Sequence, residues 1–143
     1  MAELRENREA EEKAAAAAVS VPTSIPSFAG YHLACKQHLV GRRRPSGREI
    51  DLQRRRLLHA ARFFGNRGIR DVREITRESV AAYAEHLRAE VMSVPGPTGR
   101  RIARLSPATQ RKYLGTLSNM LKRAKSMGII KTNFVADLLE RIE

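Results

Sequence analysis

The sequence predicts an all-α fold, a single compact bundle of four to five helices. Apolar residues recur at spacings of three and four in successive segments, strand-like alternation is absent, and only 3 Tyr and 4 Phe supply aromatic side chains. The expected helices are Ser27–Val40, Ser46–Phe64, Thr76–Val91, Ser106–Gly128 and Asn133–Ile142.

The two ends of the chain differ in character from its middle. Residues 1–20 are rich in Ala, Glu, Lys and Arg but have no apolar face, so we expect residues 1–25 to be a disordered or frayed helical extension. The two prolines of Val21–Pro26 mark the entry into one folded domain, expected over residues 26–143. No glycine or other C-cap ends the last helix before Glu143, so we expect the chain to have been cut from a longer protein.

The segment Ser106–Gly128 is the most informative one, because its two faces suit two different functions. Ser106 followed by Pro107 is typical of a helix N-terminus, and Gly128 stands where a helix usually ends. One face is an apolar stripe that we expect to pack into a core. Its residues are Tyr113, Leu114, Leu117, Met120, Leu121, Ala124 and Met127.

Small and basic residues share the opposite face of this helix. Over Gly115 and Ser118 a duplex backbone can approach closely, while Lys and Arg side chains reach phosphates and Asn or Arg can read base edges. A merely solvated face is the alternative, but the helix holds no Asp or Glu to balance its cations, which favours a polyanion. The face comprises Arg111, Gly115, Ser118, Asn119 and Lys122, flanked by Lys112, Arg123 and Lys125.

A second basic face is expected on Ser46–Phe64. The inner stripe of this helix is Ile50, Leu57, Ala61 and Phe64, and its outer stripe is Arg48, Arg55, His59 and Arg62. Basic residues also follow in Ser93–Leu105, where two prolines and two glycines break all periodicity and predict a flexible loop. Its Arg100, Arg101 and Arg104 could reach a phosphate.

The other helices are expected to be scaffolding. Thr76 caps the third helix, and the residues expected on its exposed face carry charges of both signs: Glu78, Glu85 and Arg88. Its expected buried residues are Val80, Tyr83, Ala84 and Leu87. The first helix is expected to turn Phe28, Tyr31, Leu39 and either Leu33 or Ala34 inward, and the last one Val135, Leu138, Leu139 and Ile142.

The charge of the chain points to an anionic partner. Its 27 Lys and Arg and 15 Asp and Glu give +12; residues 1–20, with 3 cations and 5 acids, contribute −2 of this. Arg42–Arg70 has 10 arginines and 2 acids, and Arg100–Lys125 has 8 cations and no acid, so each contributes +8. Such clustering favours nucleic acid or an anionic membrane surface. The longest apolar run, Ala14–Val19, is far short of the roughly 20 residues that span a bilayer. We therefore expect double-stranded DNA and no membrane.

Cysteine and histidine usage suggests neither a disulfide nor a metal site. The single Cys35 allows no internal disulfide, and without a recognisable signal peptide a cytoplasmic location is expected. His32 and His38 lie on either side of Cys35, but no Asp or Glu completes a metal shell, so structural or surface roles are expected. No phosphate-binding glycine pattern occurs, and we expect no cofactor and no metal.

The order of these pieces resembles the core-binding (N-terminal, SAM-like) domain of tyrosine recombinases of the phage integrase type, over roughly residues 26–143. The matching positions are Asp71, Ile75, Thr76, Ala82, Tyr83, Leu105, Ser106, Thr109, Leu117, Leu121, Gly128, Ile130 and Asn133. Phe134 departs from the pattern, because the family usually has proline there. The resemblance implies a helical bundle that clamps one side of the core recombination site, with two long helices crossing the DNA. These would be Ser46–Phe64 and Ser106–Met127. It also implies further recombinase protomers, as a synaptic tetramer of the full-length protein.

The resemblance implies that DNA cutting belongs to a separate C-terminal domain, which is absent here. Such enzymes attack a phosphodiester with a tyrosine while arginines and histidines stabilise the transition state. His59 and Arg62 match a His-x-x-Arg pattern, but no plausible nucleophile follows, and Tyr31, Tyr83 and Tyr113 lie on apolar stripes. We therefore expect this chain alone not to be an enzyme.

Three functions stay open at this point. The first is sequence-specific DNA binding at the core site of a recombinase; the second is a stand-alone helical DNA-binding regulator or architectural protein; the third is a protein interaction module whose charge serves solubility. The expected DNA-binding residues are Arg48, Arg55, Arg62, Arg100, Arg101, Arg104, Arg111, Lys112, Ser118, Asn119, Lys122 and Arg123.

Overall fold

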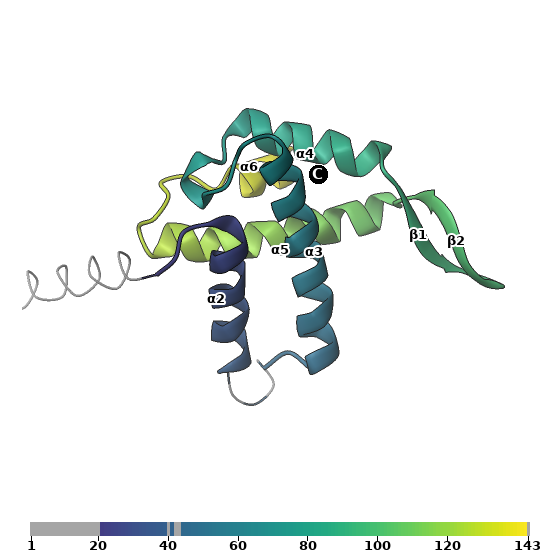
Figure 1. Ribbon diagram of the computed structural model, residues 1–143, viewed down its shortest axis with the longest axis horizontal. Coiled ribbons are helices and arrows are strands. Elements are labelled where there is room, and N and C mark those ends of the chain that lie inside the picture. Colours follow the sequence, from purple (N-terminus) through teal and green to yellow (C-terminus); the bar gives the residue numbers. More distant parts are fainter. Residues whose placement is uncertain (1–20, 40, 42–43, 143) are drawn as a thin grey trace, which may run out of the picture.

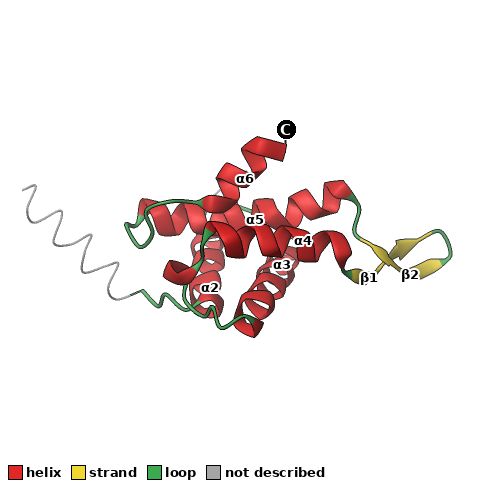
Figure 2. Ribbon diagram, turned by 90° about the horizontal axis from the view of Figure 1, so that it is seen from above, coloured by secondary structure: helices red, strands yellow, loops and turns green. Residues whose placement is uncertain are grey.

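The computed structural model describes residues 21–39, 41 and 44–142, and it consists mainly of helices (Figures 1 and 2). The expectation for residues 1–20 lies outside the described part of the chain. The elements are α2 (Ile25–Gln37), α3 (Gly47–Asn66), a 3-10 turn η2 (Val72–Glu74), α4 (Arg77–Ala89), β1 (Val91–Gly96), β2 (Gly99–Arg104), α5 (Pro107–Ser126) and α6 (Phe134–Ile142). Four to five helices were expected, and the described residues form five α-helices. Their ends differ from the expected ends by a few residues.

The helices are arranged around α5. In Figure 1, α2 and α3 run side by side and cross α5, while α4 lies along the other side of it and a β-hairpin projects beyond the α4 and α5 ends. Helix α6 packs against both α4 and α5. None of the helices in the described ranges combines the length and the apolar character needed to cross a membrane.

The apolar stripe of α5 is buried, as predicted. Leu114, Leu117, Met120, Leu121 and Ala124 are all inside the core, with Tyr113 and Met127 half-buried at its edges. The Ser106 hydroxyl accepts a hydrogen bond from the Thr109 backbone N–H at 3.2 Å, which is the expected N-cap. Helix α5 therefore begins at the N-cap that the sequence predicts, and it buries the apolar face that the periodicity predicts.

The prediction for α3 is correct except at His59. Ile50, Leu57 and Phe64 are buried, Ala61 is half-buried, and Arg48, Arg55 and Arg62 are exposed. His59, expected on the outer stripe, is 19% exposed at its side chain. Four residues after Arg55, His59 lies about 40° further around the helix, which is enough to turn it toward α4.

The prediction for α2 is wrong at its C-terminal end. Phe28 and Leu33 are buried and Tyr31 is half-buried, but Leu39 is 41% exposed because the helix ends before it, at Gln37. The helix instead begins early, and Ile25 is buried at its first position. Ile25, which we expected to belong to the extension, is therefore part of this helix and of the core.

The all-α prediction fails at Ser93–Leu105, which forms most of a β-hairpin instead of a flexible loop. β1 pairs antiparallel with β2 in the register Val91↔Arg104 to Gly96↔Gly99. Exposed and half-buried residues alternate along β1, with Met92 and Val94 turned toward the core. The glycines that suggested a loop flank the two-residue turn: a Cβ at Gly96 would meet the Gly99 carbonyl oxygen at 2.9 Å, and Gly99 has φ +116°. Proline is tolerated in β1 because both strands of such a sheet are edges.

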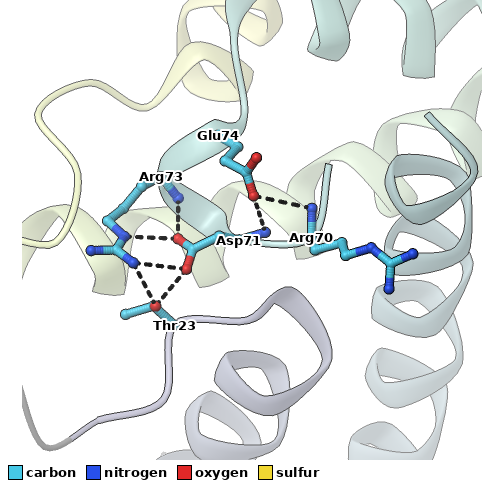
Figure 3. Close-up of polar contacts among 5 residues, drawn as sticks. All are labelled: Thr23, Arg70, Asp71, Arg73 and Glu74. Carbon is cyan, nitrogen blue, oxygen red and sulfur yellow. Dashed lines mark hydrogen bonds and ion pairs between the residues drawn. The ribbon is translucent and has the colours of Figure 1, made fainter. Parts of the chain in front are cut away.

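A polar cluster around Asp71 joins the start of α2 to the connection between α3 and α4 (Figure 3). The Thr23 hydroxyl donates to the Asp71 carboxylate at 2.6 Å, and the Arg73 side chain donates to both carboxylate oxygens, at 2.9 and 3.0 Å. Main-chain bonds from Ile25 N–H to the Arg70 carbonyl and from Val72 N–H to the Thr23 carbonyl run beside them. Hydrogen bonds from Arg73, and then from Thr23, lower the pKa of Asp71 to about 2.

Asn133 starts α6 and fixes it to α5. Its side-chain oxygen accepts from the backbone N–H groups of Val135 and Ala136, both at 3.1 Å. Its amide nitrogen donates to the carbonyl and the hydroxyl of Ser118, at 3.0 and 3.2 Å. Phe134 stands at the position where the resemblance suggested proline. The centre of its ring is 5.6 Å from the Arg77 guanidinium.

The two faces of α5 predict opposite effects of substitution. Leu117→Ala should lower the free energy of unfolding by about 2 to 5 kcal/mol, because the side chain is 1% exposed in the centre of the core. Lys122→Ala, on the exposed face, should change it by less than about 0.5 kcal/mol. Urea titrations followed by circular dichroism measure both; comparable losses in the two variants would mean that the faces are assigned wrongly.

The lowered pKa of Asp71 predicts an acid-sensitive contribution to stability. Ionised Asp71 stabilises the fold fully above its ordinary pKa of 3.8, and this contribution is lost as the pH falls through about 2. The difference in unfolding free energy between wild type and Asp71→Asn should therefore shrink steadily between those pH values. Urea titrations at a series of pH values test this; a difference that does not change with pH would contradict it.

Candidate nucleic-acid interface

The exposed face of α3 carries a row of arginines. Arg48, Arg55 and Arg62 follow one another at seven-residue intervals and are all exposed. At 1.5 Å per residue the row extends for about 21 Å along the helix. Within the described residues, none of the three lies at ion-pair distance from a carboxylate. These guanidinium groups are therefore available to an external anion.

The exposed face of α5 carries a second basic group of residues. Arg111, Lys112, Asn119 and Lys122 are exposed, and no ion pair in the described ranges involves any of the three cations. Gly115 lies among them, and a Cβ built on it would meet nothing within 4 Å, apart from its own helix backbone. The centre of this face therefore has no side chain at Gly115, and long polar side chains surround it. Such a surface lets a nucleic-acid backbone approach the helix closely.

Two residues expected to bind DNA have partners inside the protein instead. Ser118 is half-buried and accepts the hydrogen bonds from Asn133 that hold α6. Arg123 is half-buried, and its Nε donates to Nδ1 of His32 at 2.8 Å, which joins α5 to α2. Sequence position around the helix predicted both on the DNA face, but each lies at an edge of that face where a neighbouring helix packs.

His32 has the structural role that we expected for it. It is 2% exposed, and burial together with the nearby charges of Lys36 and Arg123 lowers its pKa to about 4. The imidazole is therefore neutral near pH 7, and its Nδ1 can accept the hydrogen bond that the Arg123 Nε–H donates. His38 is exposed, consistent with a surface role.

Arg56 is a residue that sequence reasoning missed. It is half-buried between the two basic faces, where its guanidinium donates to the Thr116 hydroxyl at 3.3 Å and lies 6.0 Å from the Tyr113 ring centre. It thus links α3 to α5 at their crossing. Its place in the run Arg54–Arg56 gave no signal that one of the three arginines points inward.

The three arginines of the hairpin do not share one face. Arg101 pairs with Val94 in the register and therefore lies on the same side of the hairpin as Met92. The Met92 sulfur is 4.0 Å from the Tyr113 hydroxyl of α5. Arg100 and Arg104 alternate with Arg101 and lie on the opposite side with Ile102, which is 77% exposed. Arg100 also donates to the Ser93 hydroxyl and carbonyl, at 2.8 and 2.7 Å. Only Arg101 is therefore on the hairpin face that continues toward α5.

The His-x-x-Arg match does not form a catalytic arrangement among the described residues. Nδ1 of His59 is 2.9 Å from the hydroxyl of Tyr83, which is fully buried. Burial raises the pKa of Tyr83 far above its usual range. Arg62 is exposed on the outer row of α3. The two residues of the motif therefore lie in different surroundings, His59 next to a buried tyrosine and Arg62 at the exposed surface.

The exposed face of α4, unlike those of α3 and α5, carries both acidic and basic side chains. Glu78, Glu85 and Arg88 are exposed as predicted, and Arg88 pairs with Glu85 at 2.5 Å. This mixed and partly neutralised face is a poor match for a polyanion. Among the described residues, most of the Lys and Arg side chains without an ion pair lie on α3, α5 and the hairpin.

Comparison with known proteins identifies relatives of this fold. A family model described as the phage integrase SAM-like domain matches residues 42–140. The crystal structure of the N-terminal domain of a phage integrase/site-specific recombinase from Haloarcula marismortui is similar, with a TM-score of 0.59 and 23% sequence identity. The match covers 76% of this chain and 88% of that one. No curated protein matches the sequence.

Proposed function

The chain belongs to the phage integrase SAM-like domain family, and we propose that it binds double-stranded DNA at the core site of a site-specific tyrosine recombinase. In this proposal the domain holds one side of the duplex and recognises its sequence, while cutting is left to a catalytic domain of the parent recombinase. Further protomers would assemble with it on the DNA.

The observation that carries the proposal is the crossing of two basic helices. α3 and α5 are in contact, and each presents exposed cations that no carboxylate of the described residues neutralises. Duplex DNA carries about one negative charge per 1.7 Å of its axis, so a surface with several free cations gains affinity by releasing counterions. Two crossing rows can contact phosphates on both sides of a groove, which fixes the orientation of the protein.

Most of the expected contact residues fit this role. The proposed phosphate-binding residues are Arg48, Arg55, Arg62, Arg101, Arg111, Lys112 and Lys122, and Asn119 is the proposed base-reading residue. An exposed asparagine can make two hydrogen bonds to an adenine edge in the major groove. Arg100 and Arg104, on the other hairpin face, would contact a neighbouring part of the same duplex if the DNA extends past the hairpin.

We predict that duplex binding weakens steeply with salt and that the arginine row of α3 accounts for part of the slope. Each phosphate contact contributes about −0.9 to the slope of log K against log salt. The triple variant Arg48→Ala, Arg55→Ala, Arg62→Ala should therefore have a slope shallower by roughly 2 to 3. Fluorescence anisotropy with a labelled duplex at several salt concentrations gives both slopes.

Arg88→Ala is the matched control, because it removes an exposed arginine from the mixed-charge face of α4. It should leave the slope nearly unchanged, and circular dichroism should confirm that all variants are folded. A wild-type slope near zero, or an equal effect of Arg88→Ala, would contradict the proposed surface.

We also predict that this chain neither cuts nor joins DNA. Tyr83 is buried and hydrogen-bonded to His59, and Tyr113 is half-buried beneath Met92 and Arg56, so neither is placed as a nucleophile. The purified chain can be incubated with a pool of nicked duplexes and examined by denaturing electrophoresis. A covalent adduct that disappears with Tyr113→Phe or Tyr83→Phe would refute the prediction.

A further inference from the structure

A group of metal-ligating side chains lies where α3 meets the C-terminal end of α4. His59 comes from α3, and His86 and Glu90 come from the last turn of α4 and its C-cap. We propose that these three residues bind a zinc ion. The proposal is independent of DNA binding, because none of the three belongs to the proposed contact surface.

The three ligand atoms already converge. The Glu90 carboxylate oxygen Oε2 is 2.5 Å from Nε2 of His59 and 3.0 Å from Nε2 of His86. One ligand atom from each residue lies within 4.8 Å of the other two. Zinc bonds to nitrogen and carboxylate oxygen are about 2.0 to 2.2 Å long, so ligands of one tetrahedral ion lie roughly 3.4 Å apart. Side-chain rotations alone could bring these atoms to that spacing.

The positions of the residues in the sequence support chelation. His86 and Glu90 are four apart, which places both on one side of a helix. His59 approaches from a separate helix, so an ion would join two elements that are distant in the chain. Two imidazoles and one carboxylate form a common ligand set for zinc, with a fourth position left to water.

The surroundings hold the histidine rings in a ligating orientation. Nδ1 of His59 is 2.9 Å from the Tyr83 hydroxyl, which leaves Nε2 directed at the group. Metal-bound histidines usually have such a partner on their other ring nitrogen. The His86 ring lies 4.9 Å from the Phe63 ring, centre to centre. The side chains of His59, His86 and Glu90 are 19%, 39% and 29% exposed, so an ion can enter from solvent.

A bound ion would fix the hairpin to the arginine-bearing helix. Glu90 immediately precedes β1, and His59 lies on α3 between Arg55 and Arg62. The zinc would therefore act as a structural bridge at the base of the hairpin. Mg²⁺ should not replace it, because that ion prefers oxygen ligands in octahedral geometry.

The direct test is isothermal titration of the metal-free full chain with zinc chloride. We expect one saturable equivalent, a rise in thermal unfolding temperature that a chelator reverses, and no comparable response to magnesium. Cobalt should give the absorption bands of a tetrahedral complex. The absence of saturable zinc binding, or an equal response to magnesium, would overturn the proposal.

Variants identify the ligands. His86→Gln and Glu90→Gln should each weaken zinc binding by at least about tenfold, since even the loss of an outer partner has that effect. Tyr83→Phe, which removes only the hydroxyl next to His59, should weaken it by about 10-fold to 100-fold. His38→Gln and Cys35→Ser are the controls, because both residues lie on or near α2, outside the group. If a control weakens binding as much as His86→Gln does, the zinc is bound elsewhere and the proposal is wrong.

Discussion

The packing of α5 against α2, α3, α4 and α6 is the interaction on which the rest of the structure depends. One half of this helix is an unbroken apolar stripe, and its Leu117 and Met120 side chains are almost completely buried. Because all four neighbours pack on that half, Arg111, Lys112, Asn119 and Lys122 on the opposite half stay exposed in the described part of the chain. Free energy from apolar burial thus positions the basic face, and the cations on it need not contribute to stability.

The second constraint is the crossing of α3 over α5. Arg56 bonds to Thr116 across it, and the rings of His59 and Tyr113 meet edge to face with centres 5.3 Å apart. These contacts fix the angle between two rows of cations that lie far apart in the sequence. In the proposed function their charges act on one duplex together, whereas α4, with its Glu85–Arg88 pair, adds little to the positive potential.

Periodicity and end signals in the sequence predicted the helices and most of the core, because both are local properties of the chain. The hairpin was missed because its alternation covers only a few residues and its turn glycines resemble those of a loop. The inward position of His59 and the hydrogen bond between Arg123 and His32 depend on which helix packs beside which, and so does the group with His86 and Glu90. No spacing rule contains that information, although the interval of four between the last two was visible.

The most direct test of the central claim, that α3 and α5 form one DNA-binding surface, is amide NMR mapping on the isotope-labelled chain with a short duplex. Chemical-shift changes should concentrate along Arg48–Arg62 of α3 and Arg111–Lys122 of α5, in the same titration and with the same affinity. Changes confined to one of the two helices, or concentrated on the exposed face of α4, would contradict it.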